Sequence, residues 1–247
     1  MSEHSNSNTP EFQKQNGRTT AGAPSIIVFD VNETLIDIES MGTFFENVFG
    51  DRKVLREWFN QLILYSNVTT LAGCYETFFT LGEGVFEMLG TIYGVSLTPA
   101  DCKELRAKLL SMPAHKDADK GLQLLKEAGF RLVTLTNSPP GKNGTPLDRA
   151  GLAHYFERQF SVDRVRKFKP APEAYHLVTE SLNVPPSAIC LVAAHTWDTL
   201  GAQAVGCSAA LVTRAGNAPL PIGGFPQPQL VAPDLERLAR QMIAIWR

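Results

Sequence analysis

Short apolar runs that end in polar turns recur along this chain, and the first of them is the most informative. Residues 26–29 read Ile-Ile-Val-Phe and run directly into Asp30. A continuous apolar run bounded by a turn is typical of a strand buried on both faces, as in a parallel sheet. The pattern predicts such a strand, with Asp30 at its carboxyl end, where open α/β sheets hold their ligands. A simpler interpretation is that Asp30 only caps a turn.

Helical spacing of apolar residues dominates the next seventy positions. Apolar side chains recur three and four residues apart from about residue 40 to residue 112, with helices expected over residues 75–93 and 99–110. Pro99 is a residue that favours a helix start. An all-helical block between two α/β segments predicts an inserted helical cap domain at residues 40–112. One elaborated crossover connection is the alternative.

Strands and helices alternate again after this block. Strands are predicted over residues 131–136, 160–162, 188–193 and 209–213. Helices are predicted over residues 117–128, 146–150, 172–182, 198–205 and 234–246. Such alternation implies parallel pairing through right-handed crossovers. We therefore predict the α/β fold class, a doubly wound parallel sheet, with a core domain formed by residues 23–39 and 113–247.

Composition and charge argue against several classes of partner. Of the 247 residues, 44% are hydrophobic and 19% are charged, which is ordinary for a globular protein. A formal net charge of -2 gives no reason to expect binding to nucleic acid or to an anionic membrane. No apolar run is long enough to span a bilayer. We therefore expect a small-molecule substrate as the partner, and a homodimer stays open.

The N-terminal segment and the cysteines bear on the cellular compartment. Residues 1–22 are polar and lack an apolar signal core, so we predict a disordered tail. The four cysteines show neither Cys-x-x-Cys spacing nor the density of a disulfide scaffold. Reduced thiols in a cytoplasmic protein are the expectation.

Polar side chains follow the predicted strands at one edge of the sheet. They are Asp30, Thr34, Thr136, Asn137, Lys169, His195 and Asp198. Two carboxylates, one ammonium group and several hydroxyl or amide donors would converge on one crevice. This set suits a reaction in which Asp30 attacks the substrate and the resulting ester is hydrolysed. An ammonium group beside a desolvated carboxylate would keep that carboxylate ionised and oriented.

Four short motifs carry a resemblance to a known family. They are Phe-Asp-Val-Asn-Glu-Thr-Leu at 29–35, Leu-Thr-Asn-Ser at 135–138, Lys-Pro at 169–170 and Trp-Asp at 197–198. The chain resembles the haloacid dehalogenase superfamily over residues 25–247, and most closely its type II 2-haloacid dehalogenase branch. The resemblance implies a Rossmann-like core with a helical cap inserted after the first motif. It also implies displacement of halide from a small 2-haloalkanoic acid, with no cofactor and no metal.

The resemblance implies catalytic roles for four residues. Asp30 matches the nucleophile that forms the ester, and Thr34 matches the hydroxyl that orients its carboxylate. Lys169 matches the lysine that pairs with the nucleophile. Asp198 matches the last acid, which positions or activates the hydrolytic water.

Four further residues match positions near the substrate. Thr136 and Asn137 match a hydroxyl and an amide close to the substrate and the nucleophile. Tyr175 matches a tyrosine near the lysine, and Trp197 matches an aromatic wall of the pocket. Taken singly, these residues also fit turn hydroxyls or core packing. Their occurrence together and in chain order favours the functional interpretation.

Three departures from the family pattern limit the expectation. Family dehalogenases carry a halide-binding arginine directly after a cap tryptophan, and Phe59 stands there in this chain. Loss of a comparable donor lowers rates by roughly 10²–10³-fold, so the release of poor leaving groups is in doubt unless Arg56 or another cation reaches the site. His195 replaces an asparagine, either as a donor near the water or as a structural donor. Asn32 replaces an aromatic residue.

Asn32 also bears on the alternative functions. Phosphatases of the superfamily have a second aspartate at that position as a general acid, and an amide cannot transfer that proton. They also gather acidic residues around Mg²⁺, whereas Asp198 has no adjacent acidic partner. We therefore predict a cytoplasmic 2-haloacid dehalogenase-type hydrolase. A Mg²⁺-dependent phosphatase and a non-catalytic binding protein on the same fold are the alternatives.

Overall fold

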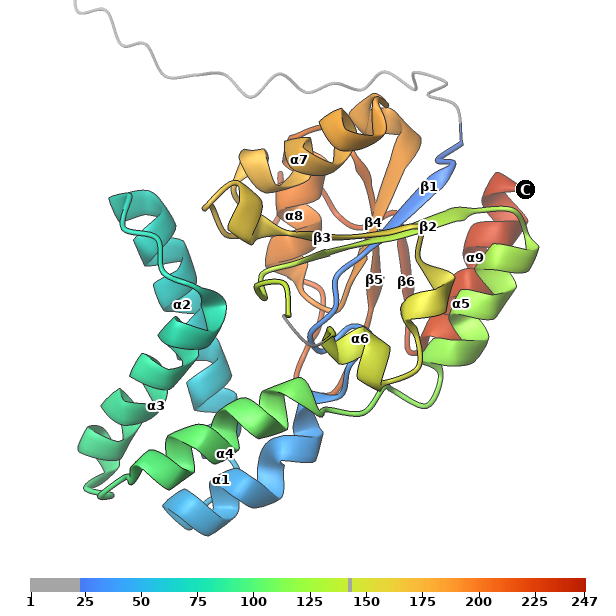
Figure 1. Ribbon diagram of the computed structural model, residues 1–247. Coiled ribbons are helices and arrows are strands. Elements are labelled where there is room, and N and C mark those ends of the chain that lie inside the picture. The colour runs from blue at the N-terminus through green and yellow to red at the C-terminus, as the bar shows by residue number, and fades with distance from the viewer. Residues whose placement is uncertain (1–22, 142–143) are drawn as a thin grey trace, which may run out of the picture.

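The computed structural model describes residues 23–141 and 144–247 (Figure 1). The predicted disordered tail, residues 1–22, lies outside the described residues. None of the helices in the described part of the chain is both long enough and apolar enough to cross a membrane.

A six-stranded sheet with the order β3-β2-β1-β4-β5-β6 forms the centre of the molecule. Its strands are β1 (Ile26–Phe29), β2 (Arg131–Thr136), β3 (Arg158–Ser161), β4 (Ile189–Ala193), β5 (Ser208–Val212) and β6 (Leu230–Ala232). Every neighbouring pair is parallel. All residues of β1 and β4 are buried, which explains why both strands read as unbroken apolar runs. The predicted α/β fold with a parallel sheet is confirmed.

Helices cover both faces of this sheet, as expected of a doubly wound fold. The helices α5 (Ala118–Glu127) and α9 (Leu235–Trp246) lie together on one face. On the other face lie α7 (Pro172–Leu182) and α8 (Thr196–Ala204) (Figure 1). The short helix α6 (Pro146–Arg149) lies in the connection between β2 and β3.

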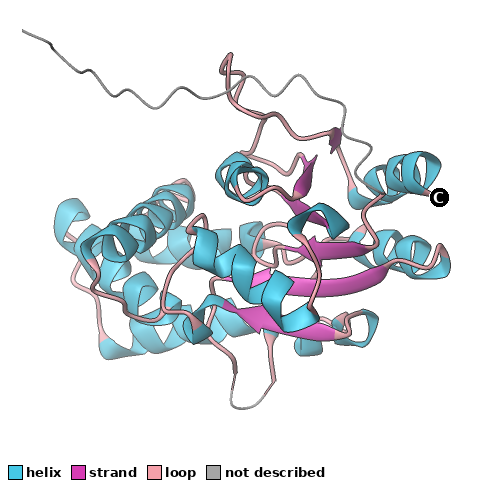
Figure 2. Cartoon of the chain, turned by 90° about the horizontal axis from the view of Figure 1, so that it is seen from above, coloured by secondary structure: helices cyan, strands magenta, loops and turns pink. Residues whose placement is uncertain are grey.

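A group of four helices stands beside the sheet and is inserted between β1 and α5. They are α1 (Gly42–Phe49), α2 (Val54–Ala72), α3 (Phe78–Tyr93) and α4 (Pro99–Leu110). The same group lies at the left of Figure 2, next to the row of strands. It has an aromatic core in which Phe45 packs between Trp58 and Phe86. A capping box formed by Thr98 and Asp101 starts α4, with Pro99 in its first turn as the sequence indicated.

Two linkers join this helical group to the sheet, and they lie against each other. Ile36 and Ala114 form an antiparallel bridge. On either side of it, the amide of Asp37 donates to the carbonyl of Pro113 at 2.8 Å and the amide of His115 donates to the carbonyl of Leu35 at 2.9 Å. Pairing satisfies the backbone groups of both linkers. It supports the predicted cap, whose limits of 40–112 stay a prediction.

Two details of the strands differ from the sequence expectation. The strand expected at 160–162 covers Arg158–Ser161, and Val162 instead begins a 3-10 turn. The edge strand β6 was not predicted, because three residues after a proline-rich segment are too few to show a hydrophobic period.

The order of the strands decides where a ligand can bind. From β1 the chain crosses first to β2 and β3 on one side, and later to β4, β5 and β6 on the other. The carboxyl ends of β1 and β4 therefore border the point where the winding reverses. In open α/β sheets such a reversal opens a crevice that holds ligands.

Candidate active site

Asp30 lies at this reversal, directly after β1. Its amide donates to the carbonyl of Val192 in β4 at 3.0 Å, which fixes the residue at the strand end. The hydroxyl of Thr34 donates to Oδ2 of Asp30 at 2.7 Å. The same hydroxyl oxygen accepts the amide of Ala194 at 2.9 Å, so its single hydrogen is directed to the carboxylate. Thr34 thus holds one oxygen of the Asp30 carboxylate, and its catalytic role stays a prediction.

Lys169 bridges the two carboxylates of the site. Its Nζ lies 2.7 Å from Oδ1 of Asp30, 2.6 Å from Oδ2 of Asp198 and 3.0 Å from the carbonyl oxygen of Leu135. These three acceptors use all three donors of the ammonium group. The backbone amide of Lys169 donates to Oδ1 of Asn137 at 3.1 Å, so this side chain positions the lysine rather than Asp30 itself.

Asp198 sits in the first turn of α8 and is held from a second side by Tyr175. The hydroxyl of Tyr175 donates to Oδ1 of Asp198 at 2.8 Å, so Tyr175 belongs to the site and is not only a packing residue. The position at a helix N-terminus also favours the negative charge of Asp198. Asp30, Lys169 and Asp198 are 4%, 1% and 0% exposed, so the whole cluster is removed from solvent.

Burial and neighbouring charges set different protonation tendencies for these groups. Burial raises the pKa of Asp30, but Lys169 and His195 outweigh it and lower the pKa below its ordinary value. Burial lowers the pKa of Lys169, but Asp198 and Asp30 outweigh it and raise the pKa. For Asp198 burial dominates, and its pKa is raised. Asp30 is therefore the carboxylate that stays most firmly ionised, as a nucleophile requires.

His195 stands next to the nucleophile between two aromatic rings. Its ring stacks on Trp197 with centroids 5.0 Å apart and on Phe59 of α2 with centroids 5.7 Å apart. Its Nε2 lies 2.7 Å from Oε2 of Glu33, and its Nδ1 lies 3.5 Å from Oδ2 of Asp30. Burial lowers the pKa of His195, but Asp30 and Glu33 outweigh it and raise the pKa to about 9. Phe59 and Trp197 thus pack on the ring of His195, and their contact with substrate stays a prediction.

Glu33 is a site residue that the sequence analysis did not single out. Its side chain is buried, and its second oxygen binds Arg56 of α2. Arg56 also donates to Glu39 at 2.6 Å and to the carbonyl of Ala215 at 2.9 Å. The guanidinium of Arg56 therefore reaches Glu33 and not Asp30. The signal available in the sequence was an acidic residue three positions after the nucleophile, inside the same polar turn.

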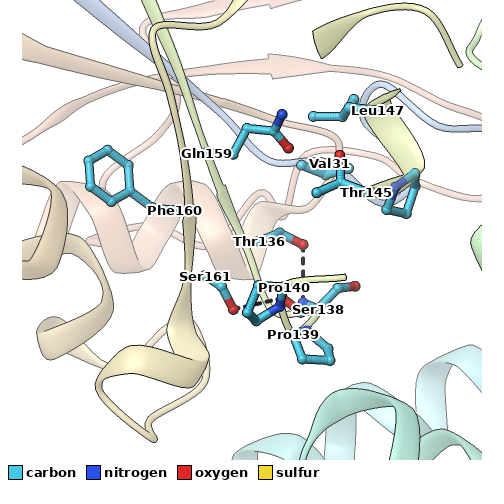
Figure 3. A pocket seen from close by; sticks show the side chains of 11 residues that line it. Val31, Thr136, Ser138, Pro139, Pro140, Thr145, Leu147, Gln159, Phe160 and Ser161 are labelled. Carbon is cyan, nitrogen blue, oxygen red and sulfur yellow. Dashed lines mark hydrogen bonds between the residues drawn. The ribbon is translucent and has the colours of Figure 1, made fainter. Parts of the chain in front are cut away.

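Asn32 and Thr136 bind Ser138. The Asn32 side chain donates to the Ser138 hydroxyl at 3.1 Å, and the Ser138 amide donates to the Thr136 hydroxyl at 3.1 Å. Thr136 and Ser138 line a cavity of about 50 Å³ beside the nucleophile turn, together with Val31 (Figure 3). This volume has room for a few water molecules. Predicted contact of Thr136 with substrate stays a prediction.

Comparison with known proteins identifies the family of this chain. A sequence model of haloacid dehalogenase-like hydrolases matches residues 24–206. The chain belongs to this family. It is 29% identical over 197 residues to an (S)-2-haloacid dehalogenase of Xanthobacter autotrophicus, covering 78% of this chain and 77% of the relative. It is 26% identical over 193 residues to (S)-2-haloacid dehalogenase 2 of Pseudomonas sp. strain CBS-3, covering 77% and 84%.

A solved structure of the family shows the same architecture. It is the L-2-haloacid dehalogenase of Xanthobacter autotrophicus with chloropropionic acid covalently bound. The TM-score is 0.78 at 26% sequence identity, with 88% of this chain and 97% of the other covered. The similarity therefore extends over sheet and helical group alike.

The raised pKa of His195 predicts a pH-dependent stability. A pKa of about 9 in the folded chain, against an ordinary 6.5, means a contribution fully present below pH 6.5 and lost as pH rises through 9. Urea unfolding of wild type and His195→Gln at pH 6 and pH 9.5 should show wild type losing up to about 3 kcal/mol relative to the variant. A difference that does not change with pH would contradict the charged state assigned to His195.

Proposed function

We propose that this protein hydrolyses the carbon–halide bond of a small 2-haloalkanoic acid through an aspartyl ester. The observation that carries the proposal is the buried, ionised carboxylate of Asp30, held by Lys169 and Thr34 at the winding reversal. A desolvated carboxylate fixed in one orientation can attack a carbon centre without losing hydration at that moment. Membership of the family and the named activity of its relatives support the same reaction.

The reaction has two steps that balance in atoms and charge. In the first step an oxygen of Asp30 bonds to carbon 2 of the substrate, and halide leaves with the electron pair of the carbon–halide bond. In the second step water adds to the carbonyl carbon of the ester, and the bond between that carbon and the substrate oxygen breaks. The products are a 2-hydroxy acid, halide and one proton, and Asp30 is regenerated. Lys169 holds the Asp30 carboxylate in the geometry needed for both steps.

The geometry favours reaction at carbon over phosphoryl transfer. The ammonium group of Lys169 lies between Asp30 and Asp198 and offsets part of their negative charge. The Asn32 amide points to Ser138 and cannot act as a general acid. Within residues 23–141 and 144–247, no three His, Cys, Asp or Glu side chains are grouped so as to hold a metal ion.

Several wider features belong to the same proposal. We propose a core of residues 23–39 and 113–247, a cap of residues 40–112 that covers the site through Phe59 and Arg56, and a cytoplasmic location.

A homodimer is also proposed, because α2 exposes an apolar stripe at helical spacing. The stripe consists of Leu64, Tyr65, Val68 and Leu71. No partner role for nucleic acid is expected at a formal net charge of -2.

A paired assay tests the reaction class. Wild type should release chloride from (S)-2-chloropropionate, should retain that activity after exhaustive chelation, and should release little phosphate from a monoester panel. Asp30→Asn, which is nearly isosteric, should fold and release no halide. Phosphate release that depends on Mg²⁺, without chloride release, would instead support the phosphatase, and inactivity in both assays would support a binding protein.

Phe59 gives a second prediction, because it occupies the place of the halide-binding arginine. An apolar wall provides a departing anion with little charge stabilisation. Phe59 is buried and contacts His195, so a longer cationic side chain there would extend toward the site. Phe59→Arg should raise the rate of chloride release, by at most about 10²-fold. Phe59→Met serves as the uncharged control.

Thermal unfolding of both Phe59 variants checks that they fold. Equal chloride release by folded Phe59→Arg and Phe59→Met would mean that position 59 does not face the departing halide.

A further inference from the structure

We propose that Thr70, in the last turn of α2, and Tyr75, just after it, are positioning residues that place Lys169 against the nucleophile. Both belong to the helical group, and both hold residues 162–169, which we call the lysine loop. This loop follows β3 and carries Lys169 to Asp30. The inference rests on the proposed function for its reaction, and on the contacts of the lysine loop for the placement itself.

Two consecutive backbone amides of the lysine loop donate to side chains from different parts of the molecule. The amide of Phe168 donates to the hydroxyl oxygen of Thr70 at 3.0 Å. The next amide, that of Lys169, donates to Oδ1 of Asn137 at 3.1 Å. Phe168 and Lys169 are both buried, and a buried amide requires such a partner. The backbone at Lys169 is therefore fixed by the helical group as well as by the sheet.

The ring of Phe168 is held from the helical group too. It stacks on Tyr75 with centroids 4.9 Å apart at an interplanar angle of 28°. Phe78, in the first turn of α3, packs on the same ring with centroids 6.1 Å apart. Aromatic rings at these separations attract each other beyond the burial of their surface. The residue before Lys169 thus has both its amide and its ring held by the helical group.

Polar contacts tie Tyr75 to an earlier part of the lysine loop. Its hydroxyl donates to Oδ1 of Asp163 at 2.9 Å. Burial and this bond to Asp163 raise the pKa of the Tyr75 hydroxyl, so the group stays a donor. The guanidinium carbon of Arg166 lies 4.9 Å from the centre of the Tyr75 ring, and Arg166 donates to the Tyr75 carbonyl at 3.3 Å. Arg166 has a φ of 53°, a left-handed conformation that surrounding contacts must hold.

The placement of Lys169 matters because its ammonium group serves three acceptors at once. Nζ donates to Asp30, Asp198 and the carbonyl of Leu135 at 2.7, 2.6 and 3.0 Å. The side chain is buried among packed neighbours, so a shift of its backbone is passed on to Nζ. Misplacement of a group by about 1 Å can lower a reaction rate by about 10²-fold. A shifted lysine loop would therefore leave the Asp30 carboxylate less well oriented for attack.

The helix α2 is joined to loops of the sheet near both of its ends. Near its start, Arg56 donates to the carbonyl of Ala215, which follows β5, at 2.9 Å. Near its end, Thr70 accepts from Phe168, which follows β3. Because a helix moves as a stiff element, a shift of the helical group is carried to the lysine loop. Placement of the helical group and placement of Lys169 are thus linked.

Single-turnover kinetics of Thr70→Val test the role of the hydroxyl. Valine keeps the shape of the side chain and removes the acceptor for the Phe168 amide. With enzyme in excess over (S)-2-chloropropionate, we expect chloride formation to slow by about 10–10²-fold. Substrate affinity, taken from the dependence on enzyme concentration, should stay close to that of wild type.

Two further threonine variants make this test specific. Thr70→Ser keeps the hydroxyl and should return chloride formation close to the wild-type rate. Thr69→Val is the matched control, because Thr69 lies on the same helix and donates to the carbonyl of Ser66 in that helix at 3.1 Å. It should behave as wild type.

Variants of Tyr75 separate its ring contact from its polar contact. Tyr75→Phe keeps the stack on Phe168 and loses the bond to Asp163, whereas Tyr75→Leu loses both. We expect chloride formation to be slower in Tyr75→Leu than in Tyr75→Phe. Tyr93→Phe is the matched control, because the Tyr93 hydroxyl contacts Glu57 within the helical group.

Hydrogen exchange followed by mass spectrometry gives a readout that needs no substrate. The peptide that contains Phe168 and Lys169 should exchange faster in Thr70→Val and in Tyr75→Leu than in wild type. Exchange of this peptide should be unchanged in Thr69→Val and in Tyr93→Phe.

A contact that only stabilises the fold would give a different result. Thr70→Val would then unfold at a lower temperature, while well below that temperature its chloride formation matched wild type, and the inference would be overturned. Slowing that Thr70→Ser does not reverse would overturn it as well. So would a loss of substrate affinity with an unchanged rate of chloride formation.

Failure of the proposed function would be seen separately. If wild type forms no chloride, the proposed reaction is wrong, and the exchange experiment alone decides the placement of the lysine loop. Faster exchange in Thr70→Val but not in Thr69→Val would support that placement, and equal exchange in both would overturn it.

Discussion

The buried ammonium group of Lys169, shared by Asp30 and Asp198, is the interaction on which the site depends. Each of these charges alone would be strongly destabilised by burial. Together they neutralise one another in part, and every hydrogen of the ammonium group has an acceptor. Asn137 fixes the backbone of Lys169, and Tyr175 fixes Asp198. The cluster therefore holds the nucleophile ionised although its side chain is buried.

Two side chains of α2 reach the residues around this cluster. Phe59 stacks on His195, and Arg56 binds Glu33, so both residues are held from the side of the helical group. Where the family pattern has a cation aimed at the halide, this chain has an aromatic ring and directs its cation to Glu33. The same two departures, at Phe59 and His195, thus appear as one rearrangement of the site. The two linkers that join the helical group to the sheet are hydrogen-bonded to each other.

Much of the fold followed from the sequence, because buried parallel strands and amphipathic helices leave strong patterns. Asp30, Lys169 and Asp198 follow strands whose ends meet, so their proximity was predictable. Glu33 was missed because its place in the site depends on a left-handed turn and on contact with His195, 162 positions away. The hydroxyl of Thr136 accepts from Ser138 within its own turn, a local contact that the sequence pattern did not indicate. The spacing of residues along the sequence does not show whether a side chain binds a neighbour in its own turn or a residue far along the chain.

Isotope incorporation into Asp30 tests the central claim most directly. Excess enzyme is allowed one turnover of (S)-2-chloropropionate in ¹⁸O-labelled water, and the peptide containing Asp30 is analysed by mass spectrometry. Attack by Asp30 followed by hydrolysis at its carbonyl carbon predicts one labelled oxygen in Asp30 and none in the lactate formed. Label in the lactate alone, with an unlabelled Asp30, would mean that water attacks the substrate directly and would contradict the account.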